Sequence, residues 1–132
     1  MNKEIELNEF TFIVSETDEK GNIIFVNGDF CETSEYTIDE LIGKPHNIVR
    51  HQDMPKVAFK DLWETIKKGE IWTGYVKNKT KSGNYYWVFA TVFPTKTSEG
   101  GIGYLSCRRK ASKEEIEEAS SLYKKLIENE KK

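Results

Sequence analysis

Five short segments rich in β-branched and aromatic residues, separated by turn-forming residues, most constrain how this chain can fold. Two of these segments lie in residues 11–27, on either side of the stretch DEKGN at 18–22. Three more lie in residues 71–110, separated by KSGN at 81–84 and SEGG at 98–101. Apolar runs joined by turns that contain Gly and Asn are typical of antiparallel hairpins. The sequence therefore predicts a five-stranded antiparallel sheet.

Helical signals lie between the two groups of strands. Asn27 is placed to cap a helix that begins at residue 28, and a Thr-x-x-Glu capping box at 37–40 indicates a second short helix. Pro55 opens a longer helix, for which Asp53 is a candidate cap. Short helices beside an antiparallel sheet define an α+β class, with the helices on one face of the sheet.

A charged amphipathic helix is predicted for residues 112–132. Ser112 and Glu115 form another capping box at its start. Its apolar positions recur at intervals of three and four, as expected for a coiled-coil seam or a helix docked on another surface: Ile116, Ala119, Tyr123 and Leu126. We therefore divide the chain into one domain, residues 1–111, and a C-terminal signalling or dimerisation helix, residues 112–132.

Composition narrows the class of protein. A length of 132 residues suits one domain, and a net charge of −2 gives no electrostatic reason to expect nucleic acid as a partner. No apolar run approaches the roughly 20 residues that cross a bilayer, and the charged N-terminus is unlike a signal peptide. The two cysteines, Cys31 and Cys107, lie far apart and outside any metal-binding spacing. These features predict a cytoplasmic domain with no direct membrane insertion.

Two stretches resemble the PAS domain of bacterial aerotaxis (energy taxis) receptors. Residues 35–55 read EYTIDELIGKPHNIVRHQDMP, and residues 67–88 read KKGEIWTGYVKNKTKSGNYYWV. The resemblance extends over almost the whole chain, with Glu35 and Gly28 as departures from the family's pattern. It implies a PAS fold that binds FAD non-covalently and reports its redox state to a chemotaxis receptor or other output module. The exit helix suggests a homodimer or a docked partner.

The candidate binding residues are concentrated in residues 46–53. By the resemblance, Arg50, His51 and Asp53 are needed to retain FAD, with Asp53 orienting Arg50 or His51. The residues alone also allow a simpler interpretation, in which the histidines are ordinary caps and Arg50 pairs with Asp53. The full predicted set of cofactor-binding residues is His46, Asn47, Arg50, His51, Asp53, Trp63, Trp72 and Asn78.

Three of these residues lie outside that segment. Trp63 and Trp72 can stack on an adenine or isoalloxazine ring, although a tryptophan at such positions is equally suited to the core. Asn78 shares a sheet face with Trp72 and can bond the pyrimidine edge of a flavin, or it can be an exposed strand-end amide. We expect reduction to change the hydrogen bonds at Asn78 and thereby bias the sheet and the exit helix.

Other functions have less support from the sequence. No Gly-rich phosphate loop or nucleophilic triad spacing indicates an enzyme. The HNIVRH segment has no cysteine for covalent flavin photochemistry. Two alternatives stay open: a haem sensor with His46 or His51 as axial ligand, and a cofactor-free interaction module whose interior is filled by Trp63 and Trp72.

Overall fold

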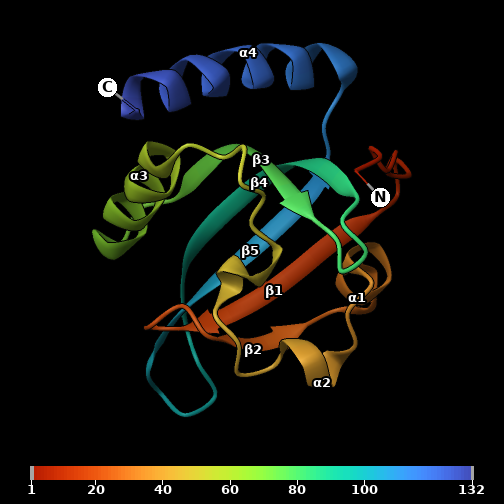
Figure 1. Cartoon of the computed structure of the whole chain (residues 1–132). Helices are drawn as coiled ribbons and strands as arrows, with labels where there is room; N and C mark the ends of the chain where they lie inside the picture. Colours follow the sequence, from red (N-terminus) through yellow and green to blue (C-terminus); the bar gives the residue numbers. More distant parts are fainter. Residues whose placement is uncertain (1, 132) are drawn as a thin grey trace.

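The computed structural model describes residues 2–131, which contain one five-stranded antiparallel sheet in the order β2-β1-β5-β4-β3 (Figure 1). The strands are β1 (Phe12–Asp18), β2 (Ile23–Val26), β3 (Trp72–Lys79), β4 (Tyr85–Lys96) and β5 (Ile102–Lys110). The last strand pairs with both β1 and β4, so it joins the N-terminal hairpin to the C-terminal strands. The predicted sheet and its turns are confirmed.

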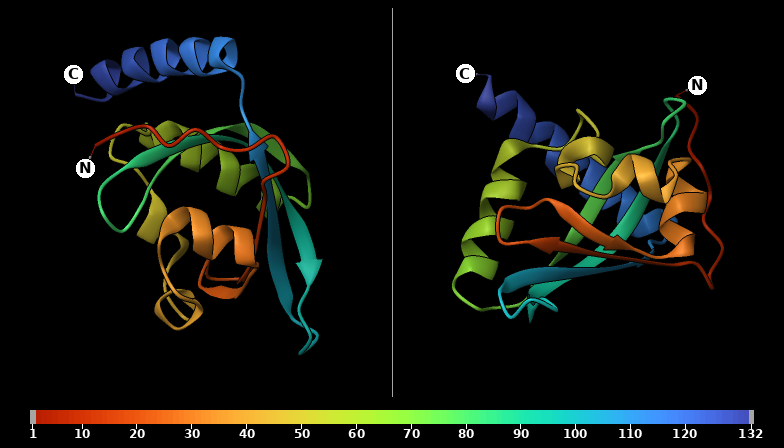
Figure 2. Two further views of the ribbon diagram at one scale, coloured as in Figure 1. Left: turned by 90° about the vertical axis from the view of Figure 1, so that its right-hand side faces the viewer. Right: turned by 90° about the horizontal axis from the view of Figure 1, so that it is seen from below.

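Three helices and one 3₁₀ helix lie between β2 and β3, along one face of the sheet (Figures 1 and 2). They are α1 (Gly28–Ser34), α2 (Ile38–Leu41), η1 (His46–Val49) and α3 (Lys56–Lys67), and α4 (Lys113–Glu130) follows β5. Within residues 2–131, none of these helices combines the length and the apolar character that crossing a membrane requires. The α+β class is confirmed.

The side chain of Asn27 joins the first hairpin to α1. Its Oδ1 accepts hydrogen bonds from the amides of Phe30 at 3.0 Å and Val14 at 3.1 Å. Its Nδ2 donates to the carbonyl of Phe12 at 2.8 Å. Asn27 is therefore the predicted helix cap, and the same side chain also holds α1 against β1.

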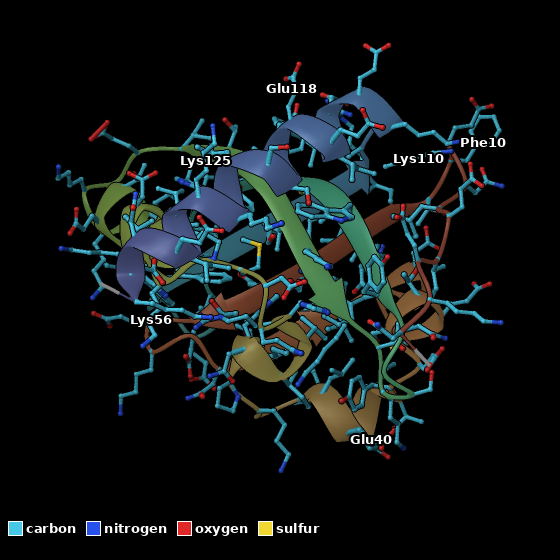
Figure 3. All side chains as sticks on the ribbon, turned by 45° about the horizontal axis from the view of Figure 1, so that its top comes forward. Phe10, Glu40, Lys56, Lys110, Glu118 and Lys125 are labelled. Carbon is cyan, nitrogen blue, oxygen red and sulfur yellow. The ribbon has the colours of Figure 1, made fainter. Side chains whose placement is uncertain are left out.

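The predicted cap of α3 by Asp53 is wrong. The N-cap residue is Pro55, which makes no side-chain capping bond. Two carboxylate oxygens of Glu130, at the end of α4, instead accept from the amides of Lys56 at 3.2 Å and Val57 at 3.0 Å. Lys56 accordingly lies beside the C-terminal end of α4 (Figure 3). An anionic group is favourable at this position because the N-terminus of a helix carries partial positive charge.

Helix α4 packs on the chain's own sheet, on the face opposite α1 to α3. The Tyr123 hydroxyl donates to the carbonyl of Tyr75 at 2.6 Å, and its ring stacks on Trp87 at a centroid distance of 6.1 Å. The hydroxyl of Tyr75 bonds to Glu115, and Ala119 is buried. Part of the seam predicted for a coiled coil or a docked helix is therefore used within the domain.

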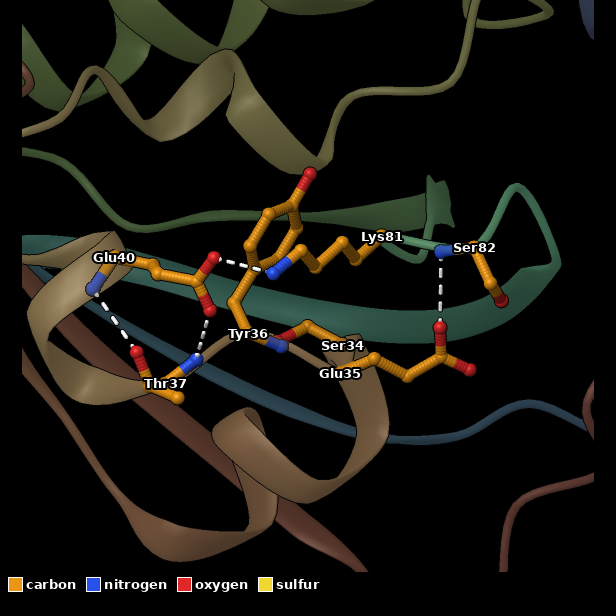
Figure 4. A network of polar contacts seen from close by, with 7 residues as sticks. All are labelled: Ser34, Glu35, Tyr36, Thr37, Glu40, Lys81 and Ser82. Carbon is orange, nitrogen blue, oxygen red and sulfur yellow. Dashed lines mark hydrogen bonds and ion pairs between the residues drawn. The ribbon is translucent and has the colours of Figure 1, made fainter.

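The loop after α1 is tied to the β3–β4 turn (Figure 4). Glu35 has a φ of 70°, in the left-handed region, and its carboxylate accepts from the amide of Ser82 at 2.9 Å. Lys81 bonds to Glu40 of α2 at 2.5 Å. Glu35 stands where the aerotaxis pattern has glycine, which adopts this backbone conformation without steric cost. The bond to Ser82 compensates for the strain at Glu35.

We predict that Glu35→Gly is more stable than Glu35→Ala. Both variants lose the bond to Ser82, but only glycine removes the steric cost of a left-handed residue, which is about 1 kcal/mol. Thermal unfolding should therefore show a higher Tm for the glycine variant, by a few degrees. Equal Tm values would mean that the backbone at residue 35 is unstrained.

Candidate functional site

A cavity of about 270 Å³ lies between the sheet and the helices of its inner face. Its apolar walls come from Val76, Ala90 and Val92 of the sheet and from Leu62 and Ile66 of α3. Ligand pockets usually have volumes of about 300–1,000 Å³. The cavity is therefore slightly smaller than this range.

The structure brings five of the eight predicted binding residues to this cavity: His46, Asn47, Arg50, Trp63 and Asn78. The first three come from η1 and the residue that follows it, where a short 3₁₀ turn presents successive polar side chains. The other two come from α3 and β3. Segments far apart in the sequence therefore converge on one space.

Arg50 is held over an aromatic ring at the cavity wall. Its Cζ lies 3.6 Å from the ring centroid of Phe59, and partial burial lowers the pKa of its guanidinium. The Nε of Arg50 is buried without a hydrogen-bond partner in residues 2–131. The predicted pair between Arg50 and Asp53 does not form, because Asp53 bonds elsewhere.

Trp63 packs at the end of the cavity near the β1–β2 turn. Its ring meets Tyr104 edge to face at a centroid distance of 5.5 Å. It also lies against Gly21, where an added Cβ would be 3.1 Å from the indole. The φ of Gly21 is 89°, in the left-handed region. This backbone conformation and the close approach of the indole both favour glycine at position 21. Trp63 therefore both lines the cavity and packs against the core.

Asn78 is buried on the inner face of β3. It is 3% exposed, so the alternative that it is an exposed strand-end amide is wrong. Its Nδ2 has no hydrogen-bond partner among the described residues. Tyr86 lies directly opposite on β4, and burial raises the pKa of its hydroxyl to about 12. The hydroxyl of Tyr86 is the polar group of the sheet that faces Asn78, whereas Nδ2 of Asn78 stays without a partner beside the cavity.

His51 does not line the cavity. The segment that contains it runs beside the edge of β3, with a bridge between Arg50 and Asn78 and a bond of 3.4 Å from the amide of His51 to the carbonyl of Lys77. Consecutive side chains of an extended segment point to opposite sides. Arg50 therefore reaches the cavity, whereas the ring of His51 packs on Tyr85 at a centroid distance of 5.8 Å.

Asp53 also lies outside the cavity. Its carboxylate bonds to the ammonium group of Lys77 at 2.7 Å, and this bond holds the pKa of Asp53 below its usual range. Its backbone amide donates to Nδ1 of His51 at 3.0 Å. The carboxylate of Asp53 also lies 3.7 Å from the same Nδ1 of His51. A role of Asp53 in retaining a cofactor stays a prediction.

Trp72 is turned away from the cavity although it shares the inner face with Asn78. Its Nε1 donates to the carboxylate of Asp61 on α3 at 2.9 Å. Its ring lies over Gly74, where an added Cβ would be 2.5 Å from the indole. The space left by this glycine lets the ring pack between β3 and α3, so the expected adenine contact at Trp72 is not supported.

Arg108 is a cavity residue that sequence reasoning missed. It is 3% exposed, and its Nη2 donates to the hydroxyl of Ser15. Its Nη1 lies 3.3 Å from Nε2 of His46, which is 2.9 Å from the same hydroxyl. Burial and the charge of Arg108 lower the pKa of His46 to about 3, so this ring is neutral at physiological pH. Burial also lowers the pKa of Arg108 to about 10, which leaves it charged.

The chain is similar in sequence and fold to known proteins. Residues 23–108 match the PAS fold family, so the chain belongs to the PAS family. It is 50% identical over 121 residues to the aerotaxis receptor of Escherichia coli, covering 91% of this chain but 24% of that receptor. The chain therefore spans about a quarter of that relative.

Two solved structures share the fold at low sequence identity. The light-state LOV domain of the blue-light photoreceptor aureochrome 1 has a TM-score of 0.66 at 21% identity, covering 93% of this chain and 91% of that one. A light-oxygen-voltage domain studied with a flavin analogue has the same score and identity, covering 90% and 87%.

We predict that Asp53→Asn lowers stability in a pH-dependent way. The carboxylate is 59% exposed, so the loss at pH 7 should stay below about 1 kcal/mol. Because the pKa of Asp53 is lowered on folding, its contribution is complete above its ordinary value of about 3.9 and is lost as the pH falls through the folded value. Urea unfolding at pH 7 and pH 3 measures this.

The matched control is Glu64→Gln, which removes an exposed pair with Lys60 at 4.0 Å. It should change stability little at either pH. A difference between wild type and Asp53→Asn that is constant from pH 7 to pH 3 would contradict the assignment of Asp53 to the Lys77 pair.

Proposed function

We propose that this domain binds a flavin, FAD, in the cavity and reports its redox state to a signalling partner in the cytoplasm. The observation that carries the proposal is a set of four buried polar atoms without partners among the described residues: Arg50 Nε, Asn78 Nδ2, Tyr86 Oη and Arg108 Nε. Three of them, those of Arg50, Asn78 and Arg108, belong to residues that line one cavity. Leaving a buried donor unpaired costs about 1–3 kcal/mol, so these residues suit a ligand that supplies acceptors.

A flavin fits both the shape and the chemistry of this wall. Its isoalloxazine ring is flat and largely apolar, with nitrogen and oxygen acceptors along one edge. The cavity offers aliphatic walls, the aromatic rings of Phe59 and Trp63, and the unpaired donors. When bound, a flavin supplies the reversible uptake of electrons and protons. The similarity to the aerotaxis receptor and to a domain studied with a flavin analogue supports this choice.

The preference for FAD rests on where the cations lie. The cavity is smaller than most ligand pockets, so part of a bound FAD must extend past its margin. Lys20 and Arg50 line the cavity but keep part of their surface exposed, and Asn47 is exposed beside them. Cations and an amide at the margin are suited to a pyrophosphate.

The haem alternative is less well supported. Nε2 of His46 is engaged by Ser15 and lies beside the charged Arg108, so its lone pair is poorly placed for iron. His51 lies outside the cavity, and its Nδ1 accepts from the amide of Asp53. A cofactor-free module is also disfavoured, because Trp63 and Trp72 leave the cavity open rather than filling it.

The C-terminal helix, residues 112–132, is the proposed output segment. Residues of helix α3 form one wall of the cavity. The first backbone amides of α3 donate hydrogen bonds to the carboxylate of Glu130, at the C-terminal end of α4. A shift of α3 on ligand reduction therefore changes how α4 is held. The partner is a chemotaxis receptor or another output module. A homodimer through the seam at Ala119 and Tyr123 requires α4 to leave the sheet.

We predict that Asn78→Ala weakens flavin binding about tenfold. One lost hydrogen bond contributes about 1.5 kcal/mol, which corresponds to a factor of ten in affinity. The measurement is a fluorescence titration of the protein with FAD, preceded by an absorption spectrum and release of the cofactor by denaturation. Lys79→Ala, the exposed neighbour on the outer face, is the control. A Soret band, or equal affinity in both variants, contradicts the proposal.

We predict that Glu130→Gln loosens the last turns of α4. The amide keeps the size of the side chain but removes the charge that interacts with the start of α3, which is worth about 0.3–1 kcal/mol. Amide hydrogen exchange in residues 120–130 should rise a few fold. Glu128→Gln, an exposed position on the same helix, should leave the exchange unchanged. Equal exchange in both variants contradicts a role for Glu130 in holding α4.

A further inference from the structure

Gly74 lies within β3, at a position whose backbone does not require glycine. Its φ lies outside the left-handed region, which five other glycines of the chain adopt. The backbone at this position would therefore accept an alanine. A glycine inside a strand also weakens the strand, because it has no side chain to pack. The reason for glycine at position 74 must therefore be what packs against it.

The indole of Trp72 occupies the space beside Gly74. A Cβ added at residue 74 would lie 2.5 Å from Cη2 and 2.6 Å from Cζ2 of the indole. Real Cβ atoms do not make contacts this short, so a side chain at residue 74 would displace the ring. Trp72 is 7% exposed, and its Nε1 donates to the carboxylate of Asp61 on α3 at 2.9 Å. Gly74 and Asp61 together therefore fix where the indole lies.

Trp72 borders the cavity without lining it. In the pairing of β3 with β4, Ala90 lies opposite Gly74 and lines the cavity. Val92, which lies opposite Trp72, and Ile66 of α3 line it as well. An indole that is displaced from Gly74 but stays between the sheet and α3 therefore enters the space beside these side chains. Exposing the ring at the edge of the sheet is less favourable, because a large aromatic ring would leave the interior.

We propose that Gly74 determines which ligands the cavity accepts, because it keeps the indole of Trp72 out of the space that a flat ring system needs. A side chain at residue 74 would move the indole into this space. The domain would then lose its ligand although no residue that contacts the ligand had been replaced. Asp61 is a positioning residue, since it holds the indole from α3. This inference rests on the function proposed above and names a determinant of specificity for the same cavity.

The first experiment is a fluorescence titration of Gly74→Ala with FAD. We expect binding at least about tenfold weaker than in the wild type, because the indole and the flavin ring compete for one space. Gly28→Ala is the matched control. A Cβ at residue 28 meets nothing within 4 Å, and the φ of Gly28 is also outside the left-handed region. This variant should bind FAD as the wild type does.

A second substitution shows whether the indole itself is the obstacle. Phenylalanine is shorter than tryptophan and lacks the indole atoms that lie closest to Gly74. We expect the double variant Gly74→Ala/Trp72→Phe to bind FAD within about threefold of Trp72→Phe alone. A loss of binding that came from a weakened strand would not be repaired in this way.

Hydrogen exchange measured before FAD is added provides a readout that does not depend on the ligand. The indole N–H of Trp72 is bonded to Asp61, so it should exchange slowly in the wild type. The exchange should be at least about tenfold faster in Gly74→Ala and unchanged in Gly28→Ala. Asp61→Ala, at an exposed position of α3, should also speed the exchange and should weaken FAD binding a few fold. Glu64→Ala, exposed on the same helix, is its control.

The outcomes separate this inference from the proposed function. Equal FAD affinity in Gly74→Ala and the wild type overturns the role of Gly74 and leaves the proposed function intact. Slow exchange of the indole N–H in Gly74→Ala does the same, as does a double variant that binds no better than Gly74→Ala. A wild-type protein that takes up no FAD overturns both. If Gly74→Ala fails to fold, equal FAD affinity in Asp61→Ala and Glu64→Ala overturns the inference.

Discussion

The five-stranded sheet presents alternate side chains to two very different surroundings, and the rest of the structure depends on this alternation. On β3, Val76 and Asn78 face the cavity. The side chain of Tyr75 contacts Glu115 of α4 on the other face, and that of Lys77 contacts Asp53. A one-residue shift in register would exchange the two sets. The register of β3 against β4 therefore fixes both which side chains of β3 reach the cavity and which of them contact α4.

Much of the fold could be predicted because each element carries a local signal. The turns, the cap at Asn27 and the capping boxes at residues 37–40 and 112–115 depend on neighbours within a few residues. The cap of α3 could not be predicted, because Glu130 is more than seventy positions away in the chain. Interactions of that kind depend on how α4 packs, which sequence periodicity does not specify.

The sequence predicted which segment reaches the cavity, but not which of its side chains point into the cavity. The HNIVRH stretch does reach the cavity, yet its path along the edge of β3 turns Arg50 inward and His51 outward. Trp72 is diverted by the gap at Gly74, a packing effect with no sequence period. Arg108 was overlooked because arginines near a strand end resemble an exposed basic patch. Only the contrast between buried Arg108 and exposed Arg109 shows which of them faces the interior.

The buried charge of Arg108 links ligand binding to the stability of the domain. The domain stabilises Arg108 with neutral partners only, so a ligand that adds acceptors lowers the free energy of the folded state and stabilises it by RT ln(1 + [L]/Kd). A ligand that carries negative charge adds to this effect, because no carboxylate of the described residues lies within ion-pair distance of the guanidinium. A ligand shifts a conformational equilibrium only by its differential affinity for the two states. Helix α3 lines the cavity and is held at its first turn by Glu130, so any ligand that binds the two positions of α3 unequally would also change how α4 is held.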